Sequence, residues 1–185
     1  AAAVSVHCNT DFTAKSDPVA RILDKAVAKL LKNASANLMD DAEIKADLTL
    51  VSQTTGENVQ LGKALAVHNP GGKTGAYIYS ITNKIAVLLS LHGKADDELI
   101  KSLGGHVAFS KPLGMTRDAV DPALVAKEHD IAVEAAKATG KPQQIAEKIA
   151  EGKLNAFFAE RVLLDQEFFN AQTFKGTVAA MLKAA

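Results

Sequence analysis

The amino-acid sequence predicts an α+β fold with an inserted antiparallel helical hairpin. Short strand-like runs and helical patterns are segregated along the chain and do not alternate as βαβ units. From Asp121 onward the chain is rich in alanine with helical spacing, and Gly140-Lys141-Pro142 predicts a tight turn between two helices. No apolar run approaches the ~20 residues that span a bilayer. We therefore expect no membrane association.

Length and composition limit the function classes. The 185 residues (19.4 kDa) suit one compact domain or two small lobes that share a core. Lys+Arg 21 balance Asp+Glu 21, so the net charge is zero, which argues against nucleic acid as a direct partner. The single cysteine, Cys8, excludes an internal disulfide and a multi-cysteine zinc site. It is compatible with a reducing compartment.

The first elements are a strand and two helices. Residues 2–8 are apolar-rich and predict a buried strand. Asp17 followed by Pro18 predicts a helix with Asp17 as N-cap. A weaker helix is predicted over residues 42–54 and stops at Gly56. The first helix has apolar residues at three- and four-residue steps: Val19, Ile22, Leu23, Ala26, Val27, Leu30 and Leu31.

Three further strands are predicted in the middle of the chain. They cover residues 59–67, 76–81 and 85–91. The turns between them lie at residues 70–72 and 82–83. We predict from this order that the three strands pair as an antiparallel meander.

Helices dominate the rest of the sequence. Asp121-Pro122 repeats the N-cap and proline combination seen at Asp17-Pro18 and predicts the start of a helix. Pro112 closes the preceding predicted helix, residues 96–110. We expect the second arm of the hairpin to be interrupted near Gly152. The predicted helices cover residues 96–110, the stretch from Asp121 to Gly140, and residues 143–165 and 177–183.

Gly72-Lys73-Thr74 resembles the end of a phosphate-binding loop, but its context does not fit. The motif needs a glycine five residues before Gly72, where this chain has Val67. It also needs a helix next, whereas residues 76–79 are strand-like. We interpret the segment as a hairpin turn and expect no nucleotide cofactor.

The cysteine and the histidines give weak signals for chemistry. His7 and Cys8 are adjacent in a predicted strand, so they point to opposite faces and cannot form a dyad. A buried structural thiol is the favoured interpretation of Cys8. No metal site is expected, because the remaining histidines lack ligand spacing: His68, His92, His106 and His129.

Thr10-Asp11-Phe12 lies where a strand gives way to a helical turn, and two interpretations are open. In one, Thr10 or Asp11 caps the turn and Phe12 packs inward, which physical reasoning alone slightly favours. In the other, Phe12 is exposed beside an acid and fills a gap in a partner protein.

Taken together, these segments resemble the family of translation elongation factor Ts. Asn9–Lys15 is close to the TDFVAK signature of that family, and Thr55–Val59 matches its GENI motif. His106–Pro112 matches the HVAAS-P pattern, and Gly140–Leu154 matches GKP…IAEKIVEGRL. The resemblance covers nearly the whole chain in order and spacing.

The resemblance implies two small sheet-and-helix lobes with the hairpin inserted as a coiled-coil arm. The expected divisions are an N-terminal core lobe at 1–72, a C-terminal core lobe at 73–116 and 166–185, and a dimerisation hairpin at 117–165. A small ubiquitin-associated-like domain usually precedes these parts in the family, and we expect it to be missing here. Tyr79 takes the place of a family histidine.

The resemblance also implies guanine-nucleotide exchange on elongation factor Tu by binding, without enzymatic chemistry or a cofactor. A second copy of the chain is a further candidate partner, through the hairpin or the core. The expected location is bacterial cytoplasm, or else a mitochondrion or plastid. The alternatives are a hairpin binding or oligomerisation module without exchange activity and a thiol enzyme using Cys8. The implied partner-binding residues are Thr10, Asp11, Phe12, Thr55, Gly56 and Tyr79.

Overall fold

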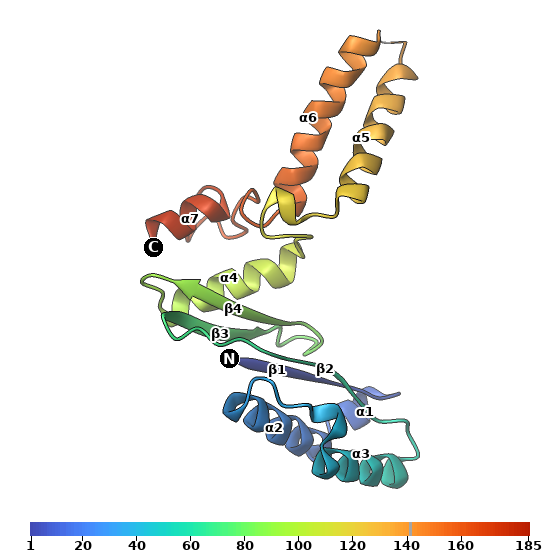
Figure 1. Ribbon diagram of the computed structural model, residues 1–185, viewed down its shortest axis with the longest axis vertical. Coiled ribbons are helices and arrows are strands. Elements are labelled where there is room, and N and C mark those ends of the chain that lie inside the picture. Colours follow the sequence, from blue (N-terminus) through green and yellow to red (C-terminus); the bar gives the residue numbers. More distant parts are fainter. Residues whose placement is uncertain (141) are drawn as a thin grey trace. The chain divides into compact units, whose positions relative to one another are not determined.

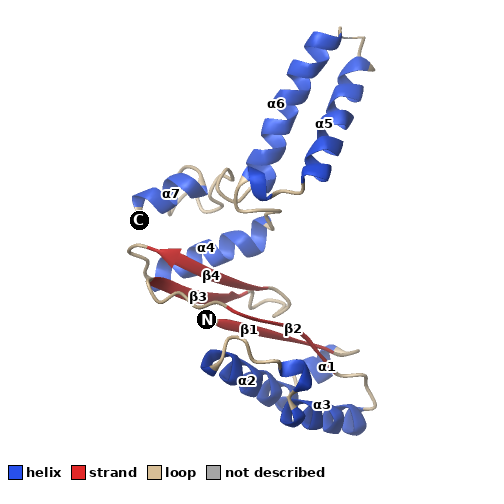
Figure 2. Cartoon of the chain, viewed as in Figure 1, coloured by secondary structure: helices blue, strands red, loops and turns tan. Residues whose placement is uncertain are grey.

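The computed structural model describes residues 1–140 and 142–185 and confirms the α+β class (Figure 2). The chain forms two compact units, residues 1–104 and 105–185, and the division falls inside helix α4 (Asp97–Ser110). Two antiparallel sheets of two strands each lie in the first unit. Among the described residues, no helix is both long enough and apolar enough to cross a membrane.

The first unit is built around strands β1 (Ala2–His7) and β2 (Gln60–Ala66), which pair antiparallel. Helices α2 (Asp17–Lys32) and α3 (Ala42–Thr55) pack together against this sheet (Figure 1). Apolar residues from both helices and from the sheet form one core because each element has an apolar face. Its buried members are Val19, Ile22, Ala26, Leu30, Leu38, Ile44, Val51 and Val59.

The ends of both helices follow from local sequence. Ser16, with extended backbone angles, is the N-cap of α2, so the prediction that Asp17 is the cap was wrong by one residue. Pro18 fits the first turn because it has no N–H to leave without a partner. The Asp41 side chain caps α3 by accepting from two backbone N–H groups. Gly56 ends α3 in the left-handed conformation (φ +71°), as predicted.

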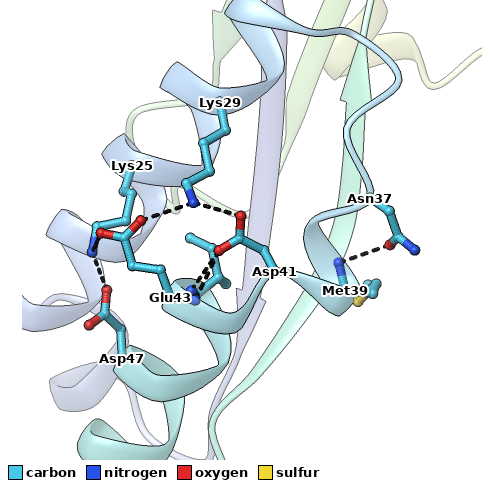
Figure 3. A network of polar contacts seen from close by, with 8 residues as sticks. Lys25, Lys29, Asn37, Met39, Asp41, Glu43 and Asp47 are labelled. Carbon is cyan, nitrogen blue, oxygen red and sulfur yellow. Dashed lines mark hydrogen bonds and ion pairs between the residues drawn. The ribbon is translucent and has the colours of Figure 1, made fainter.

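A polar network joins α2 to α3 across their solvent side (Figure 3). Lys25 contacts Glu43 at 2.7 Å and Asp47 at 2.5 Å, and Lys29 contacts Asp41 at 2.6 Å and Glu43 at 2.9 Å. The pairs meet because lysines and acids are each spaced about one helical turn apart. Hydrogen bonds from Lys25 and then Lys29 lower the pKa of Glu43, so the network is charged at neutral pH.

The middle strands do not form the predicted meander. Strand β3 (Gly72–Ile78) pairs only with β4 (Ala86–His92) within the described part of the chain, whereas β2 pairs with β1. The local turn signals favoured neighbours in sequence, but the pairing of β2 is with a strand more than fifty residues earlier. Residues 72–74 are the first of β3, so no helix follows them as it would follow a phosphate-binding loop, but the interpretation of these residues as a hairpin turn was wrong because they lie in the strand and β2 does not pair with β3.

Helix α4 lies closely against β3 because glycines allow it. A Cβ added to Gly75 would lie 2.4 Å from Cγ2 of Ile100, and one added to Gly104 would lie 2.4 Å from Cβ of Tyr77. A larger residue at either position would push the helix off the strand. The capping residue of α4 is Asp96, whose Oδ1 accepts from the N–H of Leu99 at 2.7 Å.

The second unit contains the predicted hairpin of helices α5 (Pro122–Lys137) and α6 (Gln143–Arg161), which pack side by side (Figure 1). Asp121 caps α5 as predicted, and Gly140 adopts φ +76° in the turn. Lys141 of the predicted Gly-Lys-Pro turn lies outside the described residues. Helix α6 passes through Gly152 without the expected interruption and ends before residue 165.

The two helices of the hairpin have apolar contacts of their own. Val120, Phe158 and Val162 form a buried cluster at the base of the hairpin, and Ala132, Val133 and Ala150 form another farther along. These two clusters explain why the arms stay paired along their length. The short elements are α1 (Asp11–Ala14), η1 (Leu38–Asp40), η2 (Arg117–Ala119) and α7 (Val178–Ala184).

His106 is fully buried in the second unit. Its Nε2 lies 2.9 Å from Oε1 of Gln166, and its Nδ1 accepts from the backbone N–H of Phe169 at 3.2 Å. Because Nδ1 accepts, the ring is neutral and carries its proton on Nε2, which donates to Gln166. Burial lowers the pKa of His106, and the bond to Gln166 opposes this only partly.

We predict that His106 makes the folded state sensitive to mild acid. An unfolded histidine has a pKa of about 6.5. Below that pH the unfolded state binds a proton that the folded state rejects, so stability falls as the pH decreases from 7 toward the lowered folded pKa. Urea unfolding at pH 7, 6 and 5 should show this decline. His106→Asn should weaken the dependence, while losing about 1–3 kcal/mol at pH 7 through unpaired buried groups.

An NMR measurement checks the cause independently of the variant. The ¹⁵N shifts of the His106 ring should report the neutral Nε2–H tautomer in the folded protein at pH 6. An imidazolium signal from His106 at that pH would contradict the explanation.

Candidate functional site

The Thr10–Phe12 segment forms the start of the single-turn helix α1. Thr10 is the N-cap, with extended backbone angles, and its Oγ1 accepts from the N–H of Thr13 at 3.3 Å. Thr13 is the buried residue of this turn, whereas 92% of the Phe12 side chain is exposed. Thr10 is therefore confirmed as the cap, and of the two interpretations of Phe12 the exposed one is confirmed, whereas inward packing is excluded. The small Thr13 occupies the inward position, and Phe12 points about 100° away from it around the helix.

Glu57 binds this turn from another part of the chain. Its Oε2 accepts from the backbone N–H groups of Asn9 (2.9 Å) and Thr10 (3.0 Å). Its Oε1 accepts from the hydroxyl groups of Thr10 (2.6 Å) and Thr13 (2.8 Å). The hydrogen bonds from Thr10, followed by that from Thr13, lower the pKa of Glu57, so the carboxylate is ionised at neutral pH.

Thr55 and Gly56 place Glu57. The Thr55 hydroxyl donates to the carbonyl of Val51 at 2.8 Å and accepts from the N–H of Glu57 at 3.3 Å. Gly56 then reverses the chain in a conformation that L-residues rarely adopt. The predicted pair Thr55 and Gly56 thus lies next to the Thr10–Phe12 turn in the first unit, with Glu57 as the connection.

Asp11 connects the same turn to the segment between β3 and β4. Its carboxylate lies 3.3 Å from Nζ of Lys84. Tyr79 closes that segment by donating its N–H to the carbonyl of Ile85 at 2.9 Å and accepting from the N–H of Asn83 at 2.8 Å. Tyr79 therefore shapes the loop that carries Lys84. Its half-buried side chain makes no recorded hydrogen bond with the Thr10–Phe12 turn in the described chain.

Sequence reasoning missed three residues of this arrangement: Thr13, Glu57 and Lys84. A signal for Glu57 was present, because an acid directly after a helix-ending glycine is free to accept from a hydroxyl pair. Thr10 and Thr13 form such a pair, spaced for one side of a helical turn. No signal pointed to Lys84, whose contact depends on the length of the loop between β3 and β4.

Cys8 is next to the turn but is not activated. Its Sγ lies 3.4 Å from the carbonyl oxygen of Thr10. Burial raises the pKa of the Cys8 thiol, and the negative charges of Glu57 and Asp11 raise it further. A nucleophilic cysteine needs the opposite environment. Over residues 1–140 and 142–185, no three His, Cys, Asp or Glu side chains are grouped so that they could hold a metal ion.

We predict that Cys8 reacts slowly with iodoacetamide in the folded protein. The raised thiol pKa leaves less thiolate at pH 7.5 than an ordinary cysteine has, so alkylation should be several-fold slower than that of glutathione. Mass spectrometry over time measures the rate. The same protein in urea should react like glutathione. Faster reaction in the folded state than in urea would contradict the assigned environment.

Fold and site define an α+β protein with an exposed aromatic side chain on a fixed turn, a feature of protein-binding surfaces. The comparison with known proteins agrees with this class. The family model described as Elongation factor TS matches residues 9–185, so the chain belongs to the elongation factor Ts family.

Curated relatives carry the same description. The chain is 37% identical over 176 residues to "Elongation factor Ts" of Limosilactobacillus reuteri, a match that covers 91% of this chain and 60% of the relative. It is 36% identical over 191 residues to "Elongation factor Ts" of Azoarcus sp. strain BH72, covering 100% of this chain and 63% of the relative. The chain therefore spans somewhat less than two thirds of the length of these relatives.

Proposed function

We propose that this chain is a guanine-nucleotide exchange factor that binds elongation factor Tu and promotes GDP release during translation elongation. It acts by binding alone and forms no covalent bond. The observation that carries the proposal is the exposed Phe12, held on a capped turn in a member of the elongation factor Ts family. The relatives named above are bacterial, which supports a bacterial cytoplasm as the setting.

Exchange by binding follows from thermodynamic reciprocity. A protein that binds the nucleotide-free GTPase more tightly than the GDP-bound form must weaken GDP binding by the same factor. A differential affinity of about 5.5 kcal/mol shifts such an equilibrium by roughly 10⁴. No general acid or base is needed for this effect.

The proposed roles of the side chains follow from their chemistry. Phe12 enters an apolar gap between two helices of the GTPase, and Asp11 lies near the region that supports Mg²⁺. Disturbing the Mg²⁺ shell removes the largest local positive charge from the diphosphate and weakens its binding. Thr10 caps the turn, and Thr55 and Gly56 form the adjacent part of the surface. Tyr79 contributes through the loop that ends at Ile85.

Release of labelled GDP from elongation factor Tu tests the proposal. Fluorescent GDP is preloaded on the GTPase, excess unlabelled GDP is added, and the release rate is measured with increasing amounts of this protein. Acceleration that saturates with concentration is expected. A hairpin module without exchange activity, or a thiol enzyme, would leave the rate at its basal value.

We predict that Phe12→Ala impairs exchange and leaves the fold nearly intact. An exposed aromatic at the centre of a protein contact typically contributes about 2 kcal/mol or more, so at subsaturating concentration GDP release should slow by roughly thirtyfold. Because the side chain is exposed, unfolding free energy should change by less than about 0.5 kcal/mol.

The matched control is Leu31→Ala, which removes another exposed apolar side chain from the same unit. This variant should keep wild-type exchange. Equal exchange by Phe12→Ala and Leu31→Ala would exclude Phe12 from the contact with the GTPase.

We further propose that the hairpin, residues 117–165, is a separate module. The remaining chain would then form an N-terminal core lobe, residues 1–72, and a C-terminal core lobe, residues 73–116 with 166–185. Ile131 on α5 and Ile145 on α6 are 53% and 47% exposed, which favours contact with a second copy of the chain. This observation also supports the alternative function, a binding or oligomerisation module. A self-association measurement by analytical ultracentrifugation with Ile131→Ser/Ile145→Ser tests the dimer contact.

We predict that the outer part of the hairpin is dispensable for exchange. Deleting residues 126–153 and joining Val125 to Leu154 through a short Gly/Ser linker keeps the basal cluster of Val120, Phe158 and Val162. The shortened protein should fold, as judged by circular dichroism and thermal unfolding, and should still release GDP from elongation factor Tu. Aggregation or loss of cooperative unfolding would show that the outer hairpin belongs to the core.

A further inference from the structure

Glu57 holds both ends of the segment that presents Phe12. Its two carboxylate oxygens accept four hydrogen bonds. One oxygen accepts from the backbone N–H groups of Asn9 and Thr10, and the other accepts from the hydroxyls of Thr10 and Thr13. We propose that Glu57 is a positioning residue for nucleotide exchange, which fixes the Thr10–Thr13 turn and thereby the direction of Phe12. This inference rests on the function proposed above.

The turn needs such an anchor because it cannot stabilise itself. Helix α1 has only four residues, and a helix of this length is not stable by its own hydrogen bonds. The cap within the turn is one bond of 3.3 Å between Thr10 and Thr13. Hydrogen bonds to an ionised carboxylate are shorter and stronger than such neutral bonds, and the Glu57 carboxylate accepts four of them from this segment.

The sheet brings Glu57 to this position. In the antiparallel pair β1–β2, His7 lies opposite Gln60. Continuing the same register past the end of β1 places residue 10 opposite residue 57. The carboxylate therefore meets the turn through the pairing of the two strands, and the left-handed Gly56 directs the chain into β2.

The position of Glu57 also separates it from Phe12 itself. Glu57 contacts the residues on either side of the Asp11-Phe12 pair, and none of its recorded bonds involves the exposed ring. Removing its carboxylate should therefore act on exchange only through the order of the turn. Without the turn, Phe12 must be ordered when the complex forms, which lowers the affinity for the nucleotide-free GTPase.

The first experiment measures the turn directly. Amide hydrogen exchange of Asn9 and Thr10 is followed by NMR in the wild type, Glu57→Gln, Glu57→Ala and the control Glu98→Gln, whose carboxylate is exposed on α4. In Glu57→Ala both amides should exchange on the order of tenfold faster or more. Glu57→Gln keeps one acceptor oxygen and should be intermediate, and the amides of β2 should keep wild-type rates in all four proteins.

The second experiment is a double-mutant cycle on GDP release from elongation factor Tu. Glu57→Ala should slow release on the order of tenfold when Phe12 is present and add almost nothing in a Phe12→Ala background. A role in folding alone would lower exchange equally in both backgrounds. Should Glu57→Ala fail to fold, Glu57→Gln supplies the same cycle with a smaller expected effect.

The outcomes separate the two proposals. Unchanged amide exchange in Glu57→Ala, or equal slowing with and without Phe12, overturns the positioning role. A wild-type protein that does not accelerate GDP release overturns the proposed function, and with it the role in exchange. That failure is distinguishable, because the amide exchange of Asn9 and Thr10 is measured without the GTPase.

Discussion

The hydrogen bonds that Glu57 accepts are the constraint on which the candidate site depends. They join two stretches that are far apart in sequence: the segment from the exit of β1 through the turn of α1, and the end of α3. Each stretch is short or irregular and has little stability of its own. One ionised carboxylate satisfies two backbone N–H groups and two hydroxyls, which would otherwise be left to water at the surface. The site is therefore an assembly of segments, and no single segment contains it.

The core of the first unit supports this assembly at a distance. Glu57 reaches Thr10 because β1 and β2 keep the pairing of Val6 with Leu61 and of His7 with Gln60 after a register shift between Val4 and Val6. A slip by one residue in this part would turn its side chains to the other face. Burial of Ile22, Ile44 and Val59 against the sheet makes that slip costly. The ion pairs between α2 and α3 fix the two helices relative to each other above the same core (Figure 3). Packing residues outside the site thus determine its geometry.

Local signals in the sequence predicted local structure well. Gly56 and Asp121 marked helix ends through their own backbone chemistry, and the structure places these ends within a residue or two of the prediction. Non-local pairing could not be predicted in this way: β2 joins β1, and only tertiary packing selects that partner. Residue patterns alone left two directions open for Phe12, because Thr13 was not recognised as the inward residue of a four-residue helix. Membership of the family could be inferred from ordered motifs, whereas the contacts of Glu57 with Thr10 and Thr13 were recognised only in the structure, although a local signal for Glu57 was present.

An exposed phenylalanine on a fixed turn suits the proposed function, nucleotide exchange by binding. The Phe12 side chain is not buried in its own protein, so its apolar surface is available to a partner. Ordering one residue of backbone costs about 1–2 kcal/mol, and a flexible turn would subtract that cost for each residue from the affinity for the nucleotide-free GTPase. Here the ordering takes place during folding, through Glu57 and the β1–β2 register. In the exchange function proposed above, which depends on differential affinity alone, a residue that preorganises the turn would increase the binding energy available to displace GDP without touching the nucleotide.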